Sequence, residues 1–144
     1  MRKDRSRTSS ADEPDRSLPR NRILRGRKAF QNLFSRNASH LRGTYADLRY
    51  HTRPSDNPEY KMAFIVPRRM GKAVRRNQCR RRLKEAFRHH QTHLSETVDT
   101  QQITFQGALM ATSIDAGYHE LEGDVRSLLE QARERLTAAS GPRL

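Results

Sequence analysis

The feature that most constrains this chain is the stretch of residues 73–90, which contains neither glycine nor proline. Four of its apolar side chains, Cys79, Leu83, Ala86 and Phe87, have the spacing that places them on one stripe of a helix. Such a helix is stable in a protein when its apolar stripe is buried against other elements. The sequence therefore predicts a helix that packs one face on a core and leaves the opposite face exposed.

The opposite face of this predicted helix is almost purely cationic. Residues 68–90 carry ten basic side chains and a single acidic one, Glu85. At about 100° per residue, the side chains that gather opposite the apolar stripe are Asn77, Arg80, Arg81, Lys84 and Arg88. The helix thus offers a row of cations with one amide.

Charges of one sign on a helix carry a cost. Oppositely charged side chains four residues apart stabilise a helix by about 0.2–0.5 kcal/mol, and like charges destabilise it by a similar amount. Arg76, Arg80 and Lys84 form like-charged pairs at this spacing. A phosphate backbone would neutralise the repulsion, so the pattern favours binding to nucleic acid. Eight of the ten basic residues are arginine, whose planar guanidinium grips phosphate and stacks on bases, which suits folded RNA.

The charge of the whole chain is concentrated rather than spread. Its 144 residues have a formal net charge of +13. Residues 68–90 have a net charge of +9 and residues 1–28, with ten basic and four acidic side chains, +6, whereas residues 91–144 have a net charge of −4. No run approaches the roughly 18 apolar residues that a membrane helix needs, which excludes a membrane span. The charge makes nucleic acid the first candidate partner and an anionic membrane surface the second, and of the two we expect nucleic acid and no membrane. A single cysteine excludes an intramolecular disulfide and a multi-cysteine zinc site.

The remaining patterns predict a single domain of mixed helices and strands. Residues 44–51 alternate between apolar and polar side chains, as in a half-buried strand, and residues 60–66 form a nearly continuous apolar run, as in a central strand. The expected elements are a helix over 23–34, a short extended segment over 38–41, strands over 44–51 and 60–66, the basic helix over 73–90, a strand over 103–112 and a helix over 121–136. Asp115 is the candidate N-cap of the last helix.

The two ends of the chain lack such patterns. Residues 1–17 are basic and polar with almost no apolar residues, so we expect a disordered tail that contains no secretory signal. The predicted RNA-binding domain covers residues 18–137, and residues 138–144, which include Gly141 and Pro142, are expected to be a flexible C-terminus.

The segment from Pro67 to Arg88 resembles the signature of the bacterial ribonuclease P protein subunit. The matching positions are Lys72, Val74, Arg76, Asn77, Arg80, Arg81, Lys84 and Arg88. Upstream, Leu18-Pro19 followed by basic residues, with Phe30 and Phe34, resembles the N-terminal pattern of that family. The chain departs from the pattern at Gln78, where arginine is usual, at Cys79, where an aliphatic residue is usual, and near Met110, where the strand often carries arginine.

This resemblance implies an α+β fold, a two-layer α/β sandwich in the order αβββαβα. It also implies a left-handed βαβ crossover around the basic helix. The family assists a catalytic RNA that removes 5′ leaders from precursor tRNA. The resemblance therefore implies that the RNA and its metal ions carry out catalysis, with magnesium needed by the ribonucleoprotein and no cofactor or catalytic residue in the protein. We expect a monomeric, cytoplasmic protein that binds one catalytic RNA and the precursor leader.

The resemblance also assigns residues to two surfaces. The residues expected to bind the catalytic RNA, called the basic surface below, are Arg68, Arg69, Lys72, Arg75, Arg76, Asn77, Arg80, Arg81, Lys84 and Arg88. The candidates for a cleft that holds the single-stranded leader are Phe30 and Phe34, and the weaker candidates are Tyr45, Arg49 and His51, on the polar face of the strand predicted over residues 44–51. The spacing of Phe30 and Phe34 fits ordinary core packing equally well.

Other functions have weaker support in the residues. A structural RNA-binding protein of the ribosomal type would show the same basic helix and remains the alternative. A stand-alone metal-dependent nuclease needs clustered carboxylates, and residues 68–90 offer only Glu85. His89, His90 and His93 lack the spacing of a zinc site, so we predict no metal there, and Cys79 is predicted to be a buried small hydrophobe.

Overall fold

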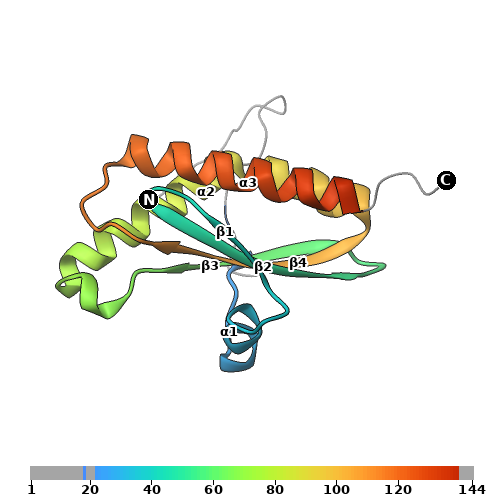
Figure 1. Cartoon of the computed structure of the whole chain (residues 1–144), viewed down its shortest axis with the longest axis horizontal. Helices are drawn as coiled ribbons and strands as arrows, with labels where there is room; N and C mark the ends of the chain where they lie inside the picture. Colours follow the sequence, from blue (N-terminus) through green and yellow to red (C-terminus); the bar gives the residue numbers. More distant parts are fainter. Residues whose placement is uncertain (1–17, 19–21, 140–144) are drawn as a thin grey trace, which may run out of the picture.

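The computed structural model describes Leu18 and residues 22–139 (Figure 1). Its elements are α1 (Arg27–Leu33), β1 (Ser39–Arg42), β2 (Ala46–Pro54), β3 (Glu59–Ile65), the short 3-10 helix η2 (Arg68–Met70), α2 (Ala73–Gln101), β4 (Ile103–Ala111) and α3 (Tyr118–Ala139). This is the αβββαβα order expected from the sequence. The predicted N-terminal tail and residues 140–144 of the predicted C-terminus lie outside the described residues. Residues 138 and 139, which were expected to be flexible, are instead the last residues of α3.

The four strands form one mixed sheet in the order β1-β2-β4-β3. β1 and β2 are antiparallel, as are β2 and β4, whereas β3 and β4 are parallel. The chain joins this parallel pair through α2, so β3, α2 and β4 form the expected βαβ unit. α2 and α3 lie over one face of the sheet, and α1 lies against the other (Figure 1). The sheet therefore separates α1 from the two long helices.

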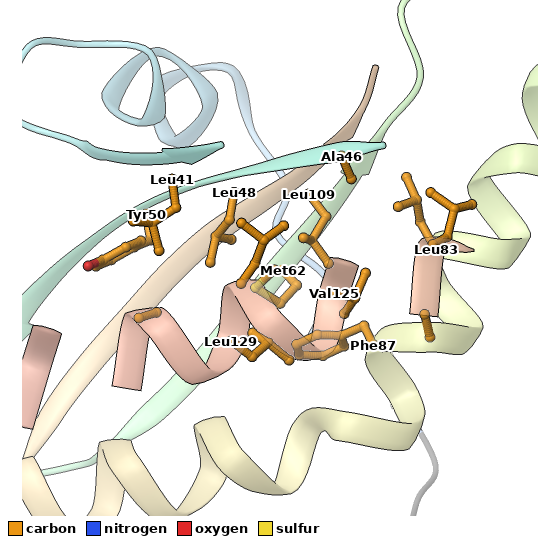
Figure 2. Close-up of a cluster of buried hydrophobic side chains, with 14 of the residues drawn as sticks. Leu41, Ala46, Leu48, Tyr50, Met62, Leu83, Phe87, Leu109, Val125 and Leu129 are labelled. Carbon is orange, nitrogen blue, oxygen red and sulfur yellow. The ribbon is translucent and has the colours of Figure 1, made fainter. Parts of the chain in front are cut away.

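The main core lies between the sheet and the two long helices. Ala46, Leu48 and Tyr50 of β2 point toward the helices and are buried, as the alternation of residues 44–51 predicts. They meet Phe87 of α2 and Leu129 of α3 (Figure 2). Full burial of a large apolar side chain stabilises a fold by about 1.5–3 kcal/mol. This layer therefore fixes how α2 and α3 sit on the sheet.

A second, smaller apolar cluster lies on the other face of the sheet. Its buried members are Leu24, Leu33, Ala63 and Ala108, and Phe30 is partly buried against them. Leu33 and Phe30 belong to α1, whereas Ala63 and Ala108 are neighbours on β3 and β4. These contacts hold α1 on the sheet.

Helix α1 begins later than the predicted range of residues 23–34. Gly26 has a φ of 102°, a left-handed conformation that a helix cannot include and that glycine tolerates. The preceding residues instead run along the outer edge of β3, where the N–H of Leu24 donates to the carbonyl of Met62 at 2.9 Å. This pairing covers part of an edge that would otherwise be open.

Helix α2 continues past His90, the end predicted for it, to Gln101. Its apolar stripe continues through Leu94 and Val98, which are both buried. Gln102 then adopts a left-handed conformation, with a φ of 55°, and its N–H donates to the carbonyl of Val98. The predicted boundary was wrong because the buried apolar stripe extends beyond the basic segment, residues 68–90. No helix in the described part of the chain is both long and apolar enough to cross a membrane.

The predicted N-cap of the last helix was also wrong. α3 begins at Tyr118, and the carboxylate of Asp115 pairs with Arg75 of α2 instead. Glu120 supplies the cap, because its carboxylate accepts a hydrogen bond from the N–H of Gly117 at 2.8 Å. The residue type of Asp115 suggested an N-cap, but its carboxylate pairs with a cation of α2 instead.

Candidate RNA interface

The apolar stripe of α2 determines which way the basic surface points. All four residues that predicted the stripe are fully buried. The ring of Phe87 packs edge-on against Tyr60 and Phe64 of β3, with centroid distances of 6.1 and 5.8 Å. Because these contacts fix the rotation of α2 about its axis, the opposite side of the helix faces away from the sheet. Arg68 and Arg69 of η2, together with Lys72 just before α2, extend this surface toward β3.

Part of the basic surface is held in place by contacts within the protein. Arg75 pairs with Asp115, and the Nε–H of Arg76 donates to the carbonyl of Gly71 at 3.0 Å. Arg80 donates to the side-chain oxygen of Asn77 at 2.7 Å. These bonds orient the guanidinium groups and connect the start of α2 to the loop before it.

Arg81 and Lys84 differ from these residues. Both are exposed on α2, and neither makes a hydrogen bond or an ion pair within the described residues. The same is true of Arg68, Arg69 and Lys72 within that part of the chain. These side chains therefore offer cationic hydrogen-bond donors to an external polyanion without first breaking a contact that the structure describes.

Glu85 does not neutralise Arg81 or Lys84. Its carboxylate accepts two hydrogen bonds from Arg88, at 2.6 and 3.1 Å, and lies 3.0 Å from the ring of His89. The hydrogen bonds from Arg88, chiefly, lower the pKa of Glu85, with a further contribution from His89. Glu85, the acidic residue of the basic segment, therefore interacts with side chains at one end of the basic surface.

The cysteine and the histidines that could act as a nucleophile or as metal ligands are buried or contact other side chains. Cys79 is fully buried, as predicted, and burial raises the pKa of its thiol, so the unreactive thiol form is favoured. His90 lies 3.0 Å from the Glu122 carboxylate, and His93 lies 3.3 Å from Arg133 of α3. Among the described residues, no group of three histidine, cysteine or acidic side chains is placed to hold a metal ion.

The structure brings two leader-cleft candidates together on the α1 face of the sheet. The guanidinium of Arg49, from β2, lies over the ring of Phe34 at 4.9 Å from its centroid. Phe34 directly follows α1 and is 45% exposed, which is unusual for a large apolar side chain. Phe30, by contrast, packs into the small cluster under α1. Phe34 and Arg49 thus form an exposed aromatic and cationic pair, whereas Phe30 belongs to the apolar cluster.

A polar hollow of about 310 Å³ adjoins this face. Its lining residues are Asn32, Ser35, Asn37, His51, Thr52 and Arg53. Burial, chiefly, and the charge of Arg53 lower the pKa of His51, so its ring is neutral at pH 7. Asn32 and Asn37 were not identified from the sequence, because isolated amides at the end of a short helix give no periodic signal.

Tyr45 lies elsewhere. It belongs to the turn before β2, and its ring packs against the main core on the side of the long helices. A hydrogen bond to Glu120 raises the pKa of Tyr45, and its backbone N–H and that of Ala46 donate to the carboxylate of Asp124. The structure therefore does not bring Tyr45 together with Phe34 and Arg49.

Comparison with protein families matches residues 18–133 to the family described as Ribonuclease P. The chain belongs to the Ribonuclease P family. A curated relative, the ribonuclease P protein component of Chloroflexus aurantiacus, is 33% identical over 85 residues. That match covers 55% of this chain and 56% of the relative, so the chain spans about half the length of the curated relatives it matches.

Solved structures share the fold of this Ribonuclease P family member. The RNase P protein from Staphylococcus aureus matches 77% of this chain and 94% of its own, with a TM-score of 0.59 and 16% identity. The RNase P protein from Thermotoga maritima matches 76% of this chain and 96% of its own, with a TM-score of 0.59 and 20% identity. These likenesses confirm the predicted α+β architecture.

Proposed function

We propose that this chain is the RNA-binding protein subunit of ribonuclease P, which assists a catalytic RNA in removing the 5′ leader from precursor tRNA. The observation that carries the proposal is a set of cations on α2, chiefly Arg81 and Lys84, that have no partner within the described part of the chain and lie inside a segment that matches the family. Exposed cations that no neighbouring acid neutralises provide the main free energy of binding to a phosphate backbone.

In this proposal the two faces of the sheet bind different RNA segments. The basic surface binds the catalytic RNA through phosphate contacts, for which Arg76 and Arg80 are already oriented, while Arg81 and Lys84 have no hydrogen-bond or ion-pair partner among the described residues. Phe34 and Arg49, on the opposite face, hold the single-stranded leader. An exposed aromatic ring stacks on any base, and the arginine beside it pairs with a phosphate, so this contact needs no particular leader sequence.

In this proposal the catalytic RNA and its magnesium ions carry out the hydrolysis, and the protein contributes binding. The carboxylates nearest the basic surface support this division, because Asp115 and Glu85 are both engaged by arginine. A stand-alone nuclease would need such carboxylates as metal ligands. We further propose that one monomer binds one catalytic RNA in the bacterial cytoplasm.

The proposal is tested by comparing the affinity for precursor tRNA with the affinity for mature tRNA. Both affinities are measured for the catalytic RNA alone and for its complex with this chain, at one fixed salt and magnesium concentration. The proposal predicts that the protein strengthens binding of the precursor much more than binding of mature tRNA, because only the precursor has a leader. Equal effects on both tRNAs, with tight binding to the catalytic RNA, would instead indicate a structural RNA-binding protein of the ribosomal type.

A further inference from the structure

A groove of about 540 Å³ lies where the start of α3 approaches α2. Its lining residues are Leu18, Arg81, Arg82, Lys84, Glu85, Arg88 and Tyr118. It shares Arg81, Lys84 and Arg88 with the basic surface, and it adds an aromatic ring, an apolar side chain and Arg82. Its volume falls within the range of about 300–1,000 Å³ that is typical of pockets for small ligands.

The apolar part of the groove comes from segments far apart in the sequence. Leu18 and Tyr118 are both partly buried against the main core. Burial, chiefly, and the nearby carboxylates of Glu122 and Glu85 raise the pKa of Tyr118, so its hydroxyl remains a hydrogen-bond donor at neutral pH. Tyr118 therefore presents a supported aromatic ring with a polar tip to the groove.

The charged part of the groove combines fixed and free cations. The guanidinium of Arg82 donates to the carbonyl of Ala116 at 3.4 Å, and Arg88 is held by two hydrogen bonds to Glu85. Arg81 and Lys84 have no such contact among the described residues. Among the described residues, four cations and one carboxylate line the groove and together carry a net charge of +3. Arg82 and Arg88 are therefore held in place by these hydrogen bonds, whereas Arg81 and Lys84 are available to bind an anion.

A ligand that suits these walls has a flat aromatic part and an attached anion. A nucleotide has both, because its base stacks on an aromatic or guanidinium plane and its phosphate pairs with arginine or lysine. Folded RNA presents such nucleotides in loops and bulges, where bases are unstacked and accessible.

We propose that this groove receives one unpaired nucleotide of the catalytic RNA, with its base against Tyr118 and its phosphate at Arg81 and Lys84. The inference rests on the proposed function and extends it from phosphate binding to insertion of a base. The catalytic RNA is the source because the groove is continuous with the basic surface. Phe34, which directly follows α1 and contacts Arg49, belongs to the opposite face of the sheet, where α1 lies (Figure 1). In this proposal Tyr118 of α3 binds RNA although it lies outside the basic segment, residues 68–90.

The chain has no tryptophan, so a single tryptophan can report on the groove. In the full chain, Tyr118→Trp places the reporter in the groove, and Val74→Trp provides a matched control. Val74 is 68% exposed at the start of α2, within the basic segment but outside the groove lining. Each variant is titrated with the catalytic RNA of a bacterial ribonuclease P and, separately, with a single-stranded leader oligonucleotide. Binding of the catalytic RNA to the unmodified chain is measured first, and its absence would contradict the proposed function itself.

Stacking on a base predicts strong quenching of the Tyr118→Trp emission by the catalytic RNA and weaker quenching of the Val74→Trp emission. Equal quenching in both variants, or none in Tyr118→Trp while the RNA binds, would overturn the proposal. Quenching by the leader oligonucleotide alone would overturn its assignment to the catalytic RNA.

Affinity provides a second measurement of the same site. Loss of one base–aromatic stack predicts that Tyr118→Leu binds the catalytic RNA about 5- to 150-fold more weakly, whereas Tyr118→Phe keeps the ring and the affinity. Both variants are checked for an unchanged circular dichroism spectrum at the binding temperature. Unaltered affinity in a folded Tyr118→Leu chain would contradict insertion of a base.

Discussion

Replacing Arg81 and Lys84 together by alanine tests the basic surface most cleanly. Neither side chain contacts another described residue by a hydrogen bond or an ion pair, so the substitution removes charge without breaking such a contact. Arg76 is a poorer choice because its guanidinium also holds the carbonyl of Gly71. Surface substitutions of this kind normally change the free energy of unfolding by less than about 0.5 kcal/mol. We therefore expect a folded variant with weakened RNA binding.

The expected magnitude follows from counterion release. Each phosphate contact contributes about 0.7–0.9 to the slope of log affinity against log salt concentration. Loss of two contacts should reduce the steepness by about 1.4–1.8. Over a fourfold increase in salt concentration, the affinity of the unmodified chain should then fall by about 7- to 12-fold more than that of the variant.

The assay is binding to the catalytic RNA across a series of salt concentrations. The matched control replaces Arg126 and Arg135, two exposed arginines of α3, by alanine, which removes the same charge away from the basic surface. The control should retain a slope close to that of the unmodified chain. An unchanged slope in the Arg81 and Lys84 variant, or an equal change in the control, would refute the reasoning and place the RNA elsewhere.

Three further predictions test other parts of the structure. Leu83→Ala should lower the free energy of unfolding by about 2–5 kcal/mol in a urea titration, because Leu83 is fully buried in the main core; a loss below 1 kcal/mol would contradict that packing. Phe34→Leu should weaken binding of a leader oligonucleotide to the complex more than Phe34→Tyr does, because leucine cannot stack on a base, while affinity for the catalytic RNA stays constant; equal oligonucleotide binding by all three chains would remove Phe34 from the cleft. Glu85→Gln should cost stability above the ordinary carboxyl pKa, and the difference from the unmodified chain should shrink as pH falls through the lowered pKa of Glu85, since protonation removes the same interaction; a difference that does not change between pH 7 and pH 2 would refute that origin.

The parts of the fold that the sequence predicted are those with a repeated local pattern. The stripe through Leu83 and Phe87 predicted α2 and its buried face because helical spacing repeats over several turns. The alternation in residues 44–51 predicted which side of β2 is buried for the same reason. The ends of helices were less predictable, because single backbone conformations at Gly26 and Gln102 set the start of α1 and the end of α2.

The parts that were missed depend on contacts between distant segments. Asp115 has the residue type of a cap, but its partner Arg75 is brought close only by the packing of α2 beside the β4–α3 loop. Tyr45 was placed with the leader-cleft candidates, whereas the turn before β2 directs it to Glu120. The groove around Tyr118 combines α2, α3 and Leu18, and no local pattern joins these three segments.

The central claim is tested most directly by cleavage of precursor tRNA at low magnesium concentration. Three reactions contain this chain alone, a bacterial ribonuclease P catalytic RNA alone, and both together. We expect mature 5′ ends to form efficiently only in the mixture. Cleavage by the chain alone, or a mixture no better than the RNA alone, would contradict it.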